Sequence, residues 1–199
     1  MTASFMHFWK NPLFNQMALK LLGGALALLL SASVWAAGNF SIKEAVLIPA
    51  AESYMLNIDF DAKLGEEVEA ALHKGVALNF LIEFKLSKPR KYWFDDEIAS
   101  ARQQVVLSYH ALSRQYLIHR ENRQKAFVTW QEAKDEFTHV RDWNVFSKES
   151  VKKGELYQAA VLIRLDQSRL PKPLQIEASS SEVWDLSSEP YLWQPSFTP

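Results

Sequence analysis

The segment from Val76 to Ser87 alternates apolar and polar side chains, and this pattern constrains the fold more than any other feature of the sequence. Every even-numbered residue of the segment is apolar, whereas Asn79, Glu83 and Lys85 on the other side are polar. A period of two residues is that of a β-strand with one face buried and the other in water. Because such strands are typical of antiparallel sheets, the segment predicts a β-rich domain.

The remaining segments predict further strands and two helices. Strands are expected over residues 40–48, 54–60, 99–112, 114–121, 126–130, 143–146, 156–166 and 174–178, with another near 182–186. Helical periodicity predicts helices over residues 65–74 and after a capping box at Thr129 and Glu132. Pro171 and Pro173 predict an extended or turning segment. The expected fold is mainly β (α+β): an antiparallel two-layer sandwich of about eight strands with two short amphipathic helices.

The N-terminal region has the layout of a signal peptide. Residues 21–37 are apolar, Lys10 and Lys20 precede them, and Val34 and Ala36 provide the small residues of a cleavage site. We therefore expect cleavage near Ala36. The alternative is an uncleaved inner-membrane anchor formed by residues 21–37, because the apolar run is borderline for spanning a bilayer.

This layout predicts three parts of the chain and their location. Residues 1–36 are the signal peptide, residues 37–189 a single β-rich domain, and residues 190–199 a loose tail. The predicted location is the periplasm or another exported compartment. A start at Met17 instead of Met1 leaves this prediction unchanged, because the apolar run follows both residues.

Composition excludes several classes of function. The 22 Lys and Arg residues nearly balance 23 Asp and Glu residues, so bulk charge favours neither nucleic acid nor an anionic membrane as partner. Membrane contact is expected only through the N-terminal segment. The absence of cysteine excludes disulfides, thiolate metal sites and a cysteine nucleophile.

Candidate catalytic and metal-binding groups are sparse. Asp95 and Asp96 are adjacent, so their side chains should point apart, and no histidine has zinc-site spacing. Asp59 and Asp61 share a strand face without the loop of a calcium site. We therefore predict no metal, no cofactor and no catalytic residue.

The most distinctive motif combines aromatic and basic residues. It consists of Arg90, Tyr92, Trp93, Arg114 and Tyr116, to which Trp184 and Trp193 add further rings. Exposed aromatic side chains beside arginine can recognise a protein, a glycan or a lipid headgroup. The alternative is structural, in which Tyr92 or Trp93 closes the sandwich edge and the basic side chains lie beside it.

Several segments together resemble an uncharacterised proteobacterial family, domain of unknown function 4390. The resemblance is carried by residues 69–76, by Phe84 with 92–95, and by residues 107–116, 143, 157, 165–166, 170–175 and 184–188. It implies an exported protein, commonly with a signal peptide, and it supplies no activity or catalytic residue. It also favours treating residues 92–93 and 170–173 as one shared surface or structural feature.

The sequence thus predicts an exported, non-enzymatic binding module whose partner is an envelope protein or another envelope component. One alternative is a carrier of an apolar small molecule, since strands rich in Phe, Leu and Ile could line a cavity. A second is a hydrolase, which requires Ser108, His110 or the pair Asp95 and Asp96 to converge in a cleft.

Overall fold

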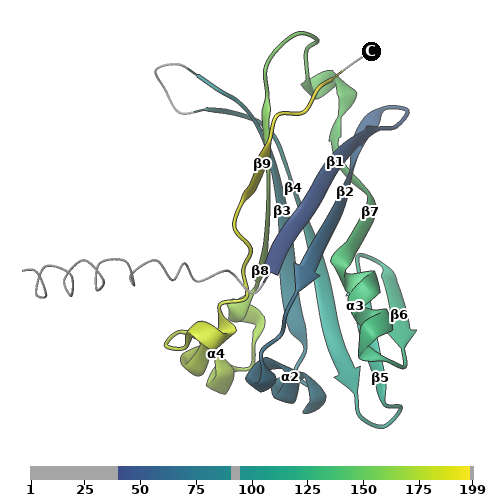
Figure 1. Cartoon of the computed structure of the whole chain (residues 1–199), viewed down its shortest axis with the longest axis vertical. Helices are drawn as coiled ribbons and strands as arrows, with labels where there is room; N and C mark the ends of the chain where they lie inside the picture. Colours follow the sequence, from purple (N-terminus) through teal and green to yellow (C-terminus); the bar gives the residue numbers. More distant parts are fainter. Residues whose placement is uncertain (1–39, 91–94, 198–199) are drawn as a thin grey trace, which may run out of the picture. The chain divides into compact units, whose positions relative to one another are not determined.

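Two antiparallel sheets pack around a shared core in the part of the chain that the structure describes. The computed structural model describes residues 40–90 and 95–197 (Figure 1). The smaller sheet has the order β1-β2-β7, with β1 (Phe40–Pro49), β2 (Ser53–Ala62) and β7 (His139–Ser147). The larger sheet has the order β6-β5-β4-β3-β8-β9. Its strands are β3 (Leu78–Lys88), β4 (Asp96–His110), β5 (Gln115–Arg120), β6 (Arg123–Phe127), β8 (Gln158–Leu165) and β9 (Tyr191–Trp193).

Short helices connect the strands and lie mainly at one end of the sheets (Figure 1). They are α2 (Glu66–His73), α3 (Trp130–Thr138) and α4 (Lys172–Ala178), together with the 3-10 turns η1 (Lys148–Ser150), η2 (Gln167–Arg169) and η3 (Glu182–Trp184). Within the described ranges, no helix has the length and apolar character needed to cross a membrane. The predicted signal peptide, residues 1–36, lies outside the described residues.

The alternating segment forms the centre of the larger sheet, which confirms the prediction of a strand there. β3 pairs antiparallel with β4 on one side and with β8 on the other. Its inward residues from Leu78 to Leu86 are all buried, whereas Val76 precedes the strand and is half-buried. With both edges paired and one face in the core, β3 is the strand around which the other elements pack.

Aromatic rings from four different elements form the core between the sheets. The ring centroid of Phe137 on α3 lies 4.8 Å from Phe80, 5.3 Å from Phe60 and 6.1 Å from Phe40. All four side chains are at most 3% exposed. The inward phenylalanines therefore fill the interior by packing against one another.

Both predicted helices are confirmed, together with their terminal signals. Gly75 adopts a φ of 90°, which disfavours a side chain, and its N–H donates to the carbonyl of Leu72. The N–H of Val76 donates to the carbonyl of Ala71, which completes a Schellman motif at the end of α2. At the start of α3, Thr129 and Glu132 form the capping box.

The C-terminal third differs from the prediction in three places, which are residues 174–178, residues 182–184 and the tail. Residues 174–178 belong to α4 instead of a strand, because Pro171 is the N-cap and Pro173 lies in the first turn, where a missing N–H costs no helical hydrogen bond. Residues 182–184 form η3 instead of a strand, and the side chain of Trp184 is fully buried. The fold therefore contains a third short helix.

The predicted loose tail is also corrected. Tyr191–Trp193 forms β9, which pairs with Ala159–Val161 of β8 and thereby adds an edge strand to the larger sheet. Beyond it, Phe197 packs against the core. The tail is ordered because β8 offers an unpaired edge and the ends of the sheets offer aromatic side chains. With nine strands in the described residues, the expected antiparallel two-layer β fold is confirmed.

Candidate functional site

The structure does not bring the predicted aromatic and basic residues together on one surface. Arg90 follows β3 and forms an ion pair with Asp96 at the start of β4, whereas Arg114 lies in the turn after the end of β4. Tyr92 and Trp93 lie outside the described residues. The predicted set is therefore divided between the two ends of β4.

Tyr116 belongs to a cluster of rings at the end of the larger sheet near α2. Its hydroxyl forms a 2.8 Å hydrogen bond with Nε2 of His73, and its ring centroid lies 4.9 Å from Tyr109 and 5.6 Å from Trp130. Burial, with smaller contributions from the nearby Tyr109 and Glu69, raises the pKa of Tyr116. The hydroxyl is thus engaged in tying α2 to β5.

The two tryptophans that extend the motif are also engaged within the fold. Trp184 is fully buried, and its indole N–H donates to Glu67 of α2 at 2.7 Å. Trp193 on β9 is half-buried, with its ring centroid 6.3 Å from that of Phe84. The tryptophans therefore fasten the C-terminal segment to the domain.

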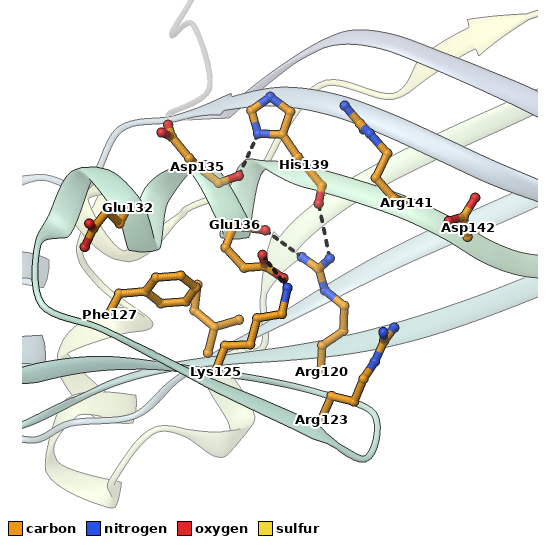
Figure 2. A pocket seen from close by; sticks show the side chains of 11 residues that line it. Arg120, Arg123, Lys125, Phe127, Glu132, Asp135, Glu136, His139, Arg141 and Asp142 are labelled. Carbon is orange, nitrogen blue, oxygen red and sulfur yellow. Dashed lines mark hydrogen bonds and ion pairs between the residues drawn. The ribbon is translucent and has the colours of Figure 1, made fainter.

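A polar groove of about 620 Å³ lies between the β5–β6 hairpin, α3 and β7 (Figure 2). On its floor, the guanidinium of Arg120 donates to the carbonyl oxygens of Glu136, Phe137 and His139 at 3.2 to 3.3 Å. Lys125 forms an ion pair with Glu136 at 2.8 Å. Burial lowers the pKa of Arg120, and the nearby Arg123 lowers it further.

These contacts give the groove a structural role. A helix leaves its last carbonyl groups without partners, and a cation at this end is favoured by the helix dipole. Arg120 satisfies two such carbonyls of α3, and the ring N–H of His139 donates to a third, that of Asp135, at 2.6 Å. The half-buried guanidinium of Arg120 therefore caps the C-terminal end of α3.

The groups required by the metal and hydrolase hypotheses are separated or already paired. Asp59 pairs with Arg141 at 2.5 Å, and Asp61 pairs with Lys43 at 2.8 Å. Among residues 40–90 and 95–197, no group of three or more His, Cys, Asp or Glu side chains is arranged to hold a metal ion. The described geometry supplies no metal site.

Ser108, His110 and the acidic pair do not converge. His110 lies at the end of β4 and hydrogen-bonds through Nδ1 to the hydroxyl of Ser113 at 2.9 Å, in an exposed turn. Asp95 and Asp96 lie at the other end of the same strand, beside Arg90. The structure therefore does not assemble the nucleophile, base and acid of a hydrolase from these residues.

A second groove, of about 410 Å³, follows the open edge of the smaller sheet. It is lined by Ala45, Val46, Leu47, Pro49, Tyr54 and residues 193–197. The strand order places β1 at the edge of its sheet, with only β2 beside it. In the described part of the chain, the outer edge of β1 has one bridge, from Phe40 to Ser188. Among residues 40–90 and 95–197, no backbone pairs with the outer side of β1 beside the groove.

Sequence reasoning did not identify this groove. Residues 45–48 were predicted as part of a strand, but a strand's position at the edge or the centre of a sheet depends on its partners and not on its own pattern. Phe197 fell in the part of the chain predicted to be loose. The signal in the sequence was the uncharged apolar run from Ala45 to Ile48, in which the structure leaves Val46 and Ile48 42% and 40% exposed.

Comparison with known proteins places the chain in a family without assigning an activity. No curated protein and no solved structure is similar enough to match the chain. Residues 37–194 match a family described as Domain of unknown function (DUF4390), and they include every strand and helix described above. The chain therefore belongs to the DUF4390 family.

Proposed function

We propose that this domain is a non-enzymatic interaction module that binds an extended, apolar segment of a partner protein as an additional strand on the outer edge of β1. The observation that carries the proposal is the edge of β1, unpaired among the described residues, beside a groove that aromatic and aliphatic side chains line together with Gln194 and Ser196. A strand added there would satisfy the free N–H and C=O groups of β1, and its alternate side chains would enter the groove.

The edge of β1 is protected near its start, by a bulge with exposed Lys43 and Glu44, and at its end, by Pro49, but not over residues 45–48 between them. This unprotected stretch supports the proposal. Proteins usually shield an exposed edge strand with charged side chains, prolines or bulges, because a free edge pairs with other chains. β6, an edge strand of the larger sheet, follows this rule with exposed Arg123 and Lys125. In β1, by contrast, residues 45–48 are uncharged, and Val46 and Ile48 expose apolar surface.

The groove determines which kind of segment fits. Its lining includes the rings of Tyr54, Trp193 and Phe197 together with the aliphatic side chains of β1. A helix could not satisfy the free backbone groups of β1, and a charged strand would lose hydration in this groove without gaining an ion pair. An extended segment with apolar side chains on one face meets both conditions.

The proposed location of this interaction is the cell envelope, with an envelope protein as partner. The apolar run of residues 21–37 and the small residues at its end support export. Mass spectrometry of the N-terminus of the purified protein tests this part separately. A chain that begins at Ala37 is expected, and a chain found only with an intact N-terminus and only in the cytoplasm would contradict export.

Site-specific photocrosslinking in intact cells tests the binding surface. A photoreactive amino acid at Val46 is expected to give one dominant adduct, and the crosslinked partner peptide should come from an extended apolar segment. The matched control is Gln124, which is exposed on the edge of β6. Equal adducts from both positions would show that the β1 edge has no special role.

Proline substitution then distinguishes strand addition from simple contact. Along an antiparallel strand, successive N–H groups point alternately to the two sides. Of Val46→Pro and Leu47→Pro, one removes a donor toward β2 and the other a donor toward the open edge. For both variants the photoreactive amino acid is placed at Ile48, which is also exposed on β1. We expect the variant that keeps wild-type stability to lose the adduct. Retention of the full adduct in that variant would overturn the proposal.

A further inference from the structure

We propose that the rings of Tyr54, Phe146 and Tyr157 form an anchor subsite for an aromatic side chain of the partner, and that Phe197 occupies this subsite in the free protein. The inference rests on the proposed function, because it assigns a recognition residue to the segment that binds beside β1. It adds a specific ligand class, an aromatic ring, and a competitor within the chain itself.

The geometry shows what kind of side chain the subsite accepts. The ring centroid of Phe197 lies 5.0 Å from Tyr54, 5.5 Å from Tyr157 and 6.1 Å from Phe146, each time with the rings close to perpendicular. Edge-to-face arrangements at these distances are the favoured contacts between aromatic rings. Three such contacts around one ring indicate a subsite matched to a phenyl group.

The subsite lies directly beside the open edge. Tyr54 and Phe197 both line the groove along β1, and the register pairs Tyr54 with Pro49, the last residue of β1. Tyr54 also stacks on Phe146 of β7, with 5.1 Å between the ring centroids. A strand added to the outer edge of β1 would therefore pass next to this group of rings.

The present occupant is held only by its side chain. In the described part of the chain, β9 is tied to β8 as far as Trp193, and no hydrogen bond fastens residues 194–197 to the domain. Phe197 itself remains half-buried. The segment can therefore leave the subsite without breaking the sheet, and the aromatic contacts alone retain it.

Occupancy by a tethered ring makes a quantitative prediction. A short flexible tether holds its end group at an effective concentration in the millimolar range. A free aromatic ligand must exceed this concentration before it displaces Phe197. Removal of the Phe197 ring should therefore strengthen the binding of a small aromatic probe by a factor of one plus the ratio of this effective concentration to the dissociation constant of the open subsite, which is about two- to fivefold when both lie in the millimolar range.

The test uses the full chain and N-acetyl-L-phenylalaninamide, a capped phenylalanine, as the probe. Binding is followed by NMR of tyrosine labelled with carbon-13 in the ring. Phe197→Ala is expected to show saturable shifts of the Tyr54 and Tyr157 signals at millimolar probe, and the wild-type chain should need a few-fold higher probe concentration for the same shifts. The capped leucine analogue should bind more weakly, because it lacks the ring.

A matched control and a second variant keep the test decisive. Leu192→Ala removes an apolar side chain that is 58% exposed on β9, outside the subsite, and should behave like the wild type. If Phe197→Ala does not fold, a chain that stops after Trp193 opens the same subsite. Equal binding by the wild type and the opened variant, or no saturable binding by a folded opened variant, would overturn the inference.

The two proposals fail in different ways. The capped amino acid cannot add a strand, so its binding reports on the ring subsite alone. Crosslinking at Val46 and its proline variants report on the edge of β1 alone. A negative probe titration with a positive crosslink would therefore leave strand addition in place and remove only the aromatic anchor.

Discussion

Replacing Arg120 with methionine should uncap α3 and weaken the whole domain. The guanidinium of Arg120 donates to the carbonyls of Glu136, Phe137 and His139, where α3 ends and β7 begins. Methionine preserves much of the apolar stem, so packing is largely retained while the donors are lost. α3 carries Phe137 into the core, so this cap connects a surface groove to the central ring cluster.

The expected loss in the free energy of unfolding is the balance of opposing effects. Hydrogen bonds from a charged donor contribute about 1.5 to 3 kcal/mol each. The three contacts are at the long end of the normal range, at 3.2 to 3.3 Å, and they share two nitrogen atoms. Water in the open groove can also rehydrate the carbonyls, and the cost of burying the cation disappears. We therefore expect a net loss of about 2 kcal/mol in the free energy of unfolding.

Urea unfolding followed by tryptophan fluorescence measures this loss. With a slope of about 2 kcal/mol per molar urea, the midpoint of Arg120→Met should fall by about 1 M. Arg123→Met is the matched control, because Arg123 faces Arg120 across the hairpin and has no ion pair among the described residues. A loss below about 0.5 kcal/mol in Arg120→Met, or an equal loss in the control, would refute the capping role.

Three further predictions concern the core, a helix start and acid sensitivity. Phe137→Ala should lower the free energy of unfolding by about 3 to 5 kcal/mol in urea melts, and a cost below about 1 kcal/mol would contradict the ring packing. Thr129→Ala should cost about 1 kcal/mol and speed amide exchange in the first turn of α3; unchanged exchange would contradict the capping box. The largest cause of the lowered pKa of the surface carboxylates Asp61, Glu97 and Glu155 is a hydrogen bond from a lysine side chain. These carboxylates stabilise the fold above their unfolded pKa values and lose this effect as the pH falls through the folded values, so the melting temperature should decline below about pH 4.5, and a constant value down to about pH 3 would contradict this.

The elements that the sequence predicted correctly are those in which local pattern and tertiary environment agree. In β3, apolar inward residues alternate with mostly polar outward ones because one face is buried along its whole length, and a capping box marks the start of α3. The prediction of a strand over residues 174–178 was wrong because the rule against proline applies only to helix interiors. Pro171 and Pro173 lie at the start of α4, where an absent N–H removes no helical hydrogen bond.

The candidate site could not be predicted from the sequence for a different reason: it depends on how the strands pair. The same strand pairing supports the proposed function. The sequence pattern predicted that Arg114 and Tyr116 lie on the surface. Only the folded structure shows that the hydroxyl of Tyr116 is hydrogen-bonded to His73. Likewise, an edge is a property of strand order. Once that order is known, the sequence of each edge becomes informative: β6 carries arginine and lysine, whereas the half of β1 beside the groove carries Ala45 to Ile48 without a charge. Because an apolar stretch of free edge promotes aggregation unless it is covered, the position of residues 45–48 beside an aromatic groove supports the proposed partner strand.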